Sequence, residues 1–359
     1  MKIARVLTAM TLLGVMAVAA QAWEGEIWLH PDAQKLPTDR RGPFVRLADG
    51  RVMAVAHNEA AFSADGGQTW TTEPIYGGAE DIQDTGGGAL LRTRDGVIVH
   101  AFLNFAEKNF AWDYEGVGPL PECQLPVYVT RSLDEGATWE EPRKLQEGWC
   151  GYVHNMIELD SGRLVLVSQV AVPDPGHHVS FTWVSDDQGV TWHRSNLIDL
   201  GGKGDHAGGI EPTVVELADG RIWMLVRTYS GHFMESWSED GGLTWSDPVA
   251  SDIEASGAPG ILLRLDSGRI LLVWNRFAEG RPKKIGRREE ISIAFSEDEG
   301  ETWTEPVVVA RNRTPEGGDP VQHRISYPDV YEHTPGEVWI TTGQGLLRMK
   351  FHESDFVQE

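Results

Sequence analysis

The stretch that decides the fold is SEDGGLTW, residues 238–245, because near copies of it occur at four other places in the chain. All the copies follow the pattern S-x-D-x-G-x-T-W, which fixes five positions in eight. A pattern this long, repeated within one chain, indicates a repeat architecture. The copies begin at Ser63, Ser132, Ser185, Ser238 and Ser296.

A second phrase alternates with the first, and it consists of an apolar run, a turn with glycine and another apolar run. VELADGRIWMLV around Gly220 is an example. Asp-Gly and Ser-Gly between short β-branched runs predict hairpins, because glycine readily takes the positive φ of a tight turn. The glycines of these phrases are Gly50, Gly96, Gly162, Gly220, Gly268 and Gly336.

The tryptophan phrase also predicts a hairpin turn, since its Asp can accept hydrogen bonds from loop amides and its Trp can pack beside the turn. Two hairpins make four strands. Six such units share the 337 residues after position 22, about 56 residues each, and the sixth lacks the tryptophan phrase. The sequence therefore predicts an all-β, six-bladed β-propeller of four-stranded antiparallel blades. Pairing of residues 24–30 or 345–351 is expected to close the ring.

The first 22 residues have the pattern of a signal peptide: Lys2 and Arg5 precede an apolar run, and Ala20-Gln21-Ala22 offers a cleavage site. A membrane anchor is the alternative, but the run is short and a polar segment follows it. We expect residues 1–22 to be removed, residues 23–359 to form a single propeller domain, and the mature protein to be secreted or periplasmic with no membrane attachment.

The composition limits the partners and the chemistry. A formal charge of −23, or −25 after loss of residues 1–22, argues against nucleic acid and anionic membranes as partners. Cys123 and Cys150 could pair in an oxidising compartment or remain free thiols. Two cysteines alone make no metal site, and we expect no metal or other cofactor.

The hairpin glycines supply a register for comparing blades. Nine residues before them, three blades carry a polar side chain at one place, and innermost strands would gather these side chains at one mouth of the propeller. The tryptophan turns are then expected on the opposite face. The residues nine positions before the glycines are Arg41, Glu211 and Tyr327. At seven positions after the glycines, the polar residues are His57, Gln169, Arg227 and Asn275.

The five tryptophan turns resemble the Asp-boxes of the sialidase (neuraminidase) superfamily, whose fold is a six-bladed propeller. Further segments resemble that superfamily's site motifs in the same order. Arg41 in RGPFVRLADG resembles the first arginine, and Arg288 in REEISIAFSEDEGETW resembles the third. Glu211 and Arg227 in EPTVVELADGRIWMLVR resemble the glutamate and second arginine, and Tyr327 in ISYPDV resembles the tyrosine.

This resemblance implies an exo-glycosidase that hydrolyses a terminal acidic sugar, sialic acid or a related keto-sugar acid, from a glycan with retention. Three guanidiniums can hold one carboxylate through paired hydrogen bonds. A neutral tyrosine suits attack at an anomeric carbon next to negative charge, with Glu211 as its base. The site prediction is thus Tyr327 and Glu211 for catalysis, with Arg41, Arg227 and Arg288 for the substrate carboxylate.

One component of the sialidase pattern is missing. The segment that carries the acid/base aspartate in sialidases is reduced here to HNEAAF, residues 57–62. Two other functions therefore stay open: a polysaccharide lyase acting on uronic-acid polymers with a Tyr and His pair, and a carbohydrate-binding propeller without catalysis. Residues 104–126 read as a long loop that could border the site. Candidate proton donors or substrate contacts are His57, Glu59, Asp81, Asp84, His154 and His206.

Overall fold

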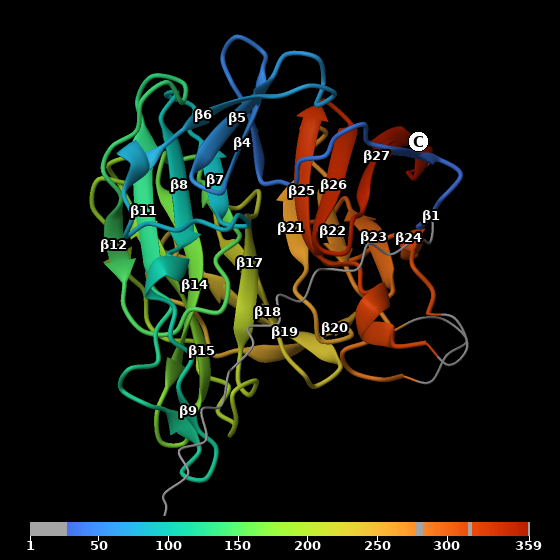
Figure 1. The fold of residues 1–359 in the computed structure, drawn as a ribbon. Coiled ribbons are helices and arrows are strands. Elements are labelled where there is room, and N and C mark those ends of the chain that lie inside the picture. Colours follow the sequence, from blue (N-terminus) through green and yellow to red (C-terminus); the bar gives the residue numbers. More distant parts are fainter. Residues whose placement is uncertain (1–26, 278–282, 315–317, 358–359) are drawn as a thin grey trace, which may run out of the picture.

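The computed structural model describes residues 27–277, 283–314 and 318–357, and it is an all-β, six-bladed propeller (Figure 1). Each blade is an antiparallel sheet of four main strands, which follow one another in order from the central axis to the outer edge. The predicted fold class is confirmed. The predicted signal peptide, residues 1–22, lies outside the described residues.

The strands follow the predicted two-hairpin units. Among the described residues, three short 3₁₀ turns lie in connections between strands, and a fourth, Glu353–Asp355, follows β27. The blades, with strands from the inside outward, are β3 (Phe44–Arg46), β4 (Val52–Ala56), β5 (Glu59–Ser63) and β6 (Thr71–Pro74); β7 (Ala89–Arg92), β8 (Ile98–Leu103), β11 (Val127–Ser132) and β12 (Arg143–Gln146); β13 (Met156–Glu158), β14 (Leu164–Val172), β15 (His177–Ser185) and β16 (His193–Arg194); β17 (Ile210–Glu216), β18 (Ile222–Arg227), β19 (His232–Ser238) and β20 (Val249–Glu254); β21 (Ile261–Arg264), β22 (Ile270–Trp274), β23 (Glu290–Ser296) and β24 (Val307–Arg311); and β25 (Ser326–Thr334), β26 (Glu337–Gln344), β27 (Arg348–His352) and β2 (Ala33–Lys35).

The ring closes through β2, which pairs with β27 at the outer edge of the sixth blade. This differs in part from the prediction. Residues 345–351 do contain most of β27, but as the third strand of the blade, whereas β1 (Trp28–Leu29) pairs with β24 of the fifth blade. A turn in which the Ala33 amide donates to the His30 carbonyl (2.9 Å) separates β1 from β2. The chain thus contacts two blade edges before it enters the first blade.

Both kinds of predicted turn occur at one end of the blades. The six hairpin glycines join first and second strands with φ between 81° and 90°, a conformation that favours glycine. The tryptophan turns join third and fourth strands. Since strands alternate in direction, Glu211 at the start of β17 and Arg227 at the end of β18 lie at the opposite end. The predicted separation of site residues and tryptophan turns is confirmed.

The aspartate of each tryptophan turn organises that turn. Asp240 Oδ1 accepts hydrogen bonds from the Ser238 hydroxyl (2.9 Å) and the Thr244 amide (2.8 Å), and Oδ2 accepts from the Thr244 hydroxyl (2.6 Å). In the first blade, the equivalent bonds from Thr69 and Ser63 lower the pKa of Asp65 to about 2. These aspartates are structural elements of the turns.

The core is distributed between neighbouring blades, so that each blade depends on the next. Leu271 and Ile293 of the fifth blade pack in one buried cluster with Val338 and Ile340 of the sixth. The predicted long loop, residues 104–126, contains the β9 (Trp112–Asp113) and β10 (Gly118–Pro119) hairpin, which projects beyond the blades at the lower end of Figure 1.

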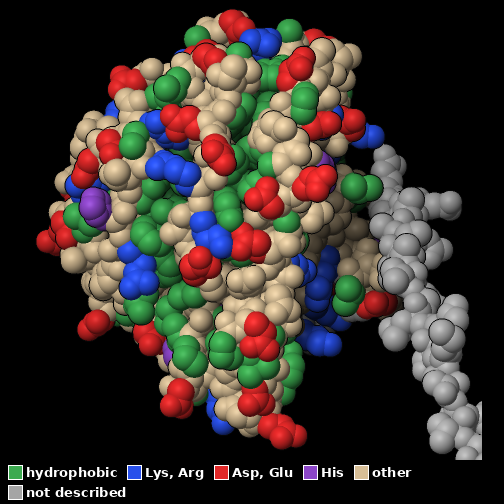
Figure 2. All heavy atoms as spheres, turned by 60° about the vertical axis from the view of Figure 1, so that its left-hand side comes forward, with side chains coloured by type: hydrophobic (Ala, Val, Ile, Leu, Met, Phe, Trp, Pro, Cys, Tyr) green, Lys and Arg blue, Asp and Glu red, His purple; other side chains and the backbone are tan. Residues whose placement is uncertain are grey.

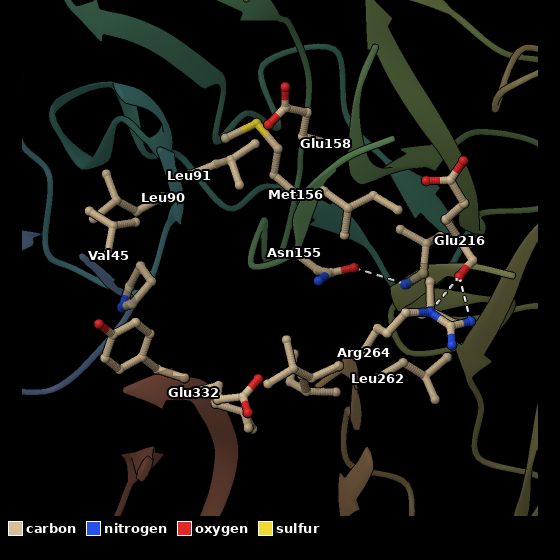
Figure 3. Close-up of a pocket in the computed structure, with 18 of the residues that line it drawn as sticks. Val45, Leu90, Leu91, Asn155, Met156, Glu158, Glu216, Leu262, Arg264 and Glu332 are labelled. Atoms are coloured by element: carbon tan, nitrogen blue, oxygen red, sulfur yellow. Dashed lines mark hydrogen bonds between the residues drawn. The ribbon is translucent and has the colours of Figure 1, made fainter. Parts of the chain in front are cut away.

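The central axis holds an open channel of about 730 Å³ (Figure 3). Apolar side chains of the innermost strands, such as Val45, Leu90, Met156 and Leu262, surround it. Its lining reaches Arg94, Asp160 and Asp266 in the hairpin turns, so it opens on the face of the tryptophan turns. The acidic side chains of this chain are spread over the visible face in Figure 2 among basic ones.

Two further observations concern the cysteines and the membrane. Cys123 and Cys150 are buried free thiols, which decides the alternative that the sequence left open. Burial raises the pKa of Cys150 to about 11, so it is an inert thiol. Among the described residues, we find no helix with the length and apolar character needed to cross a membrane.

We predict that Asp240→Ala lowers the free energy of unfolding by about 1–2 kcal/mol, because it removes several side-chain hydrogen bonds of one turn. Chemical denaturation measures this change. Asp247→Ala, at an exposed position of the following loop, is the matched control and should leave stability within about 0.5 kcal/mol. Equal stability of the two variants would show that the turn does not need its aspartate.

Candidate functional site

Three predicted residues from two blades meet at the end of the propeller opposite the tryptophan turns. The Tyr327 hydroxyl donates to Glu211 Oε1 at 3.0 Å and accepts from Arg227 Nη1 at 3.1 Å. Arg227 also forms a direct ion pair with Glu211 Oε2. Arg227 and Glu211 are only 2% and 6% exposed, so these contacts are shielded from water.

The backbone at this point is held in an uncommon conformation. Glu211 and Tyr327 have φ of 50° and 61°, in the left-handed region that non-glycine residues rarely adopt. The Glu211 amide donates to the side-chain oxygen of Gln169, a residue that the register also singled out. A bulge in β17 between Ile210 and Thr213 accompanies the turn of Glu211 into the site. Such strain is typical of functional positions.

Arg288 approaches the same tyrosine from the fifth blade. Its guanidinium carbon lies 5.5 Å from the centre of the Tyr327 ring, and that of Arg227 lies 6.0 Å from it. Arg288 is 5% exposed and donates to the Gly257 carbonyl (2.8 Å) and the Gln344 side chain (3.3 Å). Among the described residues, no carboxylate lies within 4.0 Å of this buried cation.

Arg41 completes the cluster from the first blade. Its Nε lies 3.2 Å from Oδ2 of Asp329, a buried carboxylate on β25. A methyl group built on Gly343 would lie 2.9 Å from Arg41 Nη1 and 3.2 Å from the Tyr327 Cβ, so Arg41 and Tyr327 meet across this glycine. All five predicted catalytic and carboxylate-binding residues therefore share one region.

Burial and charge shift the pKa values in this cluster. Burial raises the pKa of Tyr327, and the Glu211 carboxylate raises it further, whereas Arg227 and Arg288 oppose the shift. For Arg227, burial is the largest single cause and acts to lower the pKa, but Glu211, Tyr327 and Tyr229 together raise it and the net shift is upward. The arrangement therefore keeps Tyr327 neutral and Arg227 charged.

Three side chains of the site were not in the predicted set. Asp329 pairs with Arg41, and the Tyr229 hydroxyl accepts from Arg227 Nη2 at 2.6 Å. Tyr152 packs edge-on against Tyr327 with ring centres 5.1 Å apart. Asp329 follows Tyr327 by two residues on a strand and thus shares its face. That spacing of two was a signal in the sequence.

The remaining candidates divide into two groups. His57 is exposed and lines a cavity with Arg41, and His206 packs edge-on at 5.8 Å against Tyr229. Buried His154 stacks on Tyr152 with ring centres 4.6 Å apart. These three histidines border the cluster.

The three acidic candidates have other surroundings. Asp84 is buried, its Oδ2 lies 3.0 Å from His100 Nε2, and its Oδ1 accepts from the Gly86 amide at 2.7 Å. Both oxygens are therefore engaged within the protein. Asp81 lines a separate cavity with Trp139 and Lys144. Glu59 begins β5, and no hydrogen bond joins it to the cluster among the described residues.

Comparison with known proteins adds a family to this geometry. The BNR repeat-like domain family matches residues 57–340. The chain belongs to this family, within the sialidase-like superfamily. Among curated proteins, a sialidase of Micromonospora viridifaciens is 24% identical over 274 residues, which cover 67% of this chain and 39% of that protein. A sialidase of Clostridium perfringens is 28% identical over 159 residues, 38% of this chain and 40% of that protein.

Solved structures agree on the fold. A protein of unknown function from Dyadobacter fermentans superposes with a TM-score of 0.63 at 19% identity, covering 89% of this chain and 98% of its own. The Hadza microbial sialidase Hz136 gives a TM-score of 0.61 at 19% identity, covering 90% and 66%. The BNR repeat-like chain spans about two fifths of the length of the curated relatives that it matches. The similarity at this identity establishes the propeller.

We predict a pH dependence of stability from His154. Burial lowers its pKa from 6.5 to about 4, so the unfolded chain binds the proton first as the pH falls. The stabilisation is complete above pH 6.5 and is lost progressively towards pH 4, by up to about 3 kcal/mol. His154→Phe keeps an aromatic ring without titration. Denaturation curves should show wild type losing stability relative to this variant between pH 6.5 and 4, and parallel pH profiles would contradict the assignment.

Proposed function

We propose that this protein is an exo-glycosidase that removes a terminal acidic sugar, sialic acid or a related keto-sugar acid, from a glycan with retention of configuration. The observation that carries this proposal is the Tyr327 hydroxyl held 3.0 Å from Glu211 Oε1 beside buried Arg288, which has no carboxylate partner among the described residues. The names of the sialidase relatives point to the same substrate class. Export through residues 1–22 is part of the proposal.

The charges of the cluster support an anionic substrate. Arg41 faces Asp329 and Arg227 faces Glu211, but the hydrogen-bond acceptors of buried Arg288 within the described residues are all neutral. An uncompensated buried charge is costly. One positive charge therefore remains for a ligand, and a single carboxylate would neutralise it with charge-assisted hydrogen bonds.

The tyrosine and glutamate are placed for nucleophilic catalysis. In the first step, Glu211 accepts the hydroxyl proton of Tyr327, whose oxygen bonds to the anomeric carbon while the bond to the leaving oxygen breaks. Burial disfavours the phenolate, and so proton removal has to accompany attack. In the second step, water displaces Tyr327 and gives one proton back to the group that protonated the leaving oxygen, and Tyr327 recovers its own proton from Glu211. Two inversions give retention.

The leaving oxygen also needs a proton, and His57 is the side chain that we propose for this task. It lies on the two-residue turn between β4 and β5, where both His57 and Asn58 have positive φ. This tight turn replaces the loop that carries an aspartate in sialidases. His57 is exposed and borders the same cavity as Arg41, so an imidazolium there can reach a bound glycan.

Two other functions have a specific observation in their favour. The stacked Tyr152 and His154 beside Tyr327 supply the Tyr and His pair that a uronate lyase needs. The tight β4–β5 turn favours a binding propeller without catalysis. Incubation with sialyl-lactose and with uronate polymers separates the three functions. Free sugar acid supports hydrolysis, ultraviolet absorbance of an unsaturated product supports elimination, and binding without turnover supports a lectin role.

We predict that Tyr327→Phe reduces turnover of an acidic glycoside by roughly a thousandfold or more, because the attacking oxygen is lost while the arginines remain. Affinity for the free sugar acid should change little. Tyr331→Phe, four residues along the same strand, removes a hydroxyl outside the cluster and is the matched control. Initial rates and calorimetric binding measure both effects. Near-normal turnover by Tyr327→Phe would exclude the tyrosine mechanism.

A second prediction concerns the leaving group. His57→Ala should slow hydrolysis of a sialylated sugar by about a hundredfold, because an alkoxide leaves poorly without a proton. It should slow an aryl glycoside, whose phenolate leaves unaided, by less than about threefold. His193→Ala, at an exposed position of β16, is the control. An equal loss on both substrates would assign His57 to binding instead of proton donation.

A further inference from the structure

A cationic cavity of about 310 Å³ lies beside the proposed site, between the first blade, β27 of the sixth blade and the segment that precedes β7 of the second. Arg40, Arg41 and Arg348 line it together with His57, and Ala54 and Ala56 contribute small side chains. Arg41 belongs both to this cavity and to the cluster around Tyr327. The two sites are therefore contiguous.

Two features of the chain create this space. The β4–β5 connection is a two-residue turn at His57 and Asn58, so no loop covers the cavity from that side. On the other wall, a methyl group built on Gly87 would lie 1.7 Å from Arg41 Nη2, so only glycine admits the guanidinium there. Asp84 fixes the adjoining turn by accepting from the Gly86 amide at 2.7 Å. The cavity is thus part of the ordered fold.

The cavity has an excess of positive charge. Arg348 donates to the carbonyl oxygens of Leu347 (2.6 Å) and Thr342 (3.4 Å), and in the described part of the chain it has no carboxylate within 4.0 Å. Among the described residues, the one ion-pair partner of Arg40 is the exposed Asp39 at 4.0 Å, which also lines the cavity and forms only a weak pairing.

The surroundings of Arg348 also disfavour its positive charge. Burial lowers its pKa, and the nearby positive charge of Arg41 lowers it further, while Asp329 and Asp39 oppose the shift. Asp329 already forms an ion pair with Arg41, with Oδ2 at 3.2 Å from Nε. An anion in the cavity would relieve both the burial and the repulsion of these guanidiniums.

We propose that this cavity binds a second oxyanion of the substrate, the carboxylate of an acidic sugar attached to the terminal one. The inference rests on the proposed function and narrows its substrate class to glycans with two successive acidic sugars. Because the Arg41 guanidinium borders both sites, an anion beside Arg348 lies next to the sugar that faces Tyr327. Planar guanidiniums favour a carboxylate through paired hydrogen bonds. A sulfate ester has similar oxyanion chemistry and is tested alongside.

The first experiment measures binding to the full chain with Tyr327→Phe, which prevents turnover. Calorimetry compares the acidic monosaccharide, a disaccharide of two acidic sugars and a sulfated neutral disaccharide bearing the same terminal acid. We expect the two-acid disaccharide to bind at least about tenfold tighter than the monosaccharide, as one further charge-assisted contact provides. Equal affinities would overturn the proposal. Tighter binding of the sulfated ligand than of the two-acid ligand would overturn the carboxylate assignment.

Variants of the arginines that line the cavity test whether the tighter binding of the disaccharide arises there. Arg348→Gln and Arg40→Gln should each remove most of the advantage of the disaccharide and leave the monosaccharide within about twofold. Arg51→Gln makes the same change of net charge in the first blade, at a residue paired with Asp49 in the hairpin turn at the opposite end. It should retain the advantage. A loss in Arg51→Gln equal to that in Arg348→Gln would indicate general electrostatics and overturn the assignment to the cavity.

The second experiment uses inorganic sulfate and does not depend on the proposed function. Arg288→Gln disables the first anion site. Sodium sulfate, compared with sodium chloride at equal ionic strength, should still raise the melting temperature of Arg288→Gln and should lose this effect in the double variants with Arg348→Gln or Arg40→Gln. No specific sulfate effect in Arg288→Gln would overturn the cavity as an anion site, whatever reaction occurs at Tyr327.

Discussion

The propeller depends on hydrogen bonds between a glutamate of one blade and a backbone amide of the blade before it, on the face of the tryptophan turns. In two blades a glutamate inside the tryptophan turn makes this bond and also pairs with an arginine four residues before the hairpin glycine. In three others, the residue at that position is itself the glutamate. The acceptor and donor pairs are Glu135 and Ala48, Glu158 and Arg94, Glu216 and Asp160, Glu299 and Ala218, and Glu332 and Asp266, at 2.8–3.1 Å.

These hydrogen bonds between blades explain how Glu211 and Tyr327 keep their strained backbone conformation at the opposite end of the propeller. Between the first and sixth blades, the contact is made by Arg46, which donates a hydrogen bond to the His333 carbonyl at 2.9 Å. With the ring closed, each innermost strand is fixed in rotation about the axis. Glu211 and Tyr327 can then be held at positive φ, because the surrounding blades determine their position. A contact between residues 116 positions apart in the chain is built in this way on rigid strands.

Much of this organisation could be predicted because it is local and repeated. Turn motifs fixed the strand directions, and a constant count from Gly220 and Gly336 identified Glu211 and Tyr327. What could not be predicted depends on long-range geometry. The role of β2 as the closing strand follows from where the first and last blades meet, and the burial of Asp84 beside His100 follows from packing within the second blade. Tyr152 contacts Tyr327 across the axis, and no local pattern marks it.

The overall charge imposes a last constraint on the site. A chain with formal charge −23 repels an acidic glycan at long range, so steering cannot provide the affinity. Salt screens that repulsion beyond about 10 Å, whereas contacts with buried guanidiniums are screened far less. Arg227 and Arg288 are nearly inaccessible, so the carboxylate that we propose for this site would be held by direct contact and not by the long-range field. For such a protein, moderate salt should raise the association rate of an acidic ligand more than it weakens the bound state, the reverse of the behaviour of a basic protein.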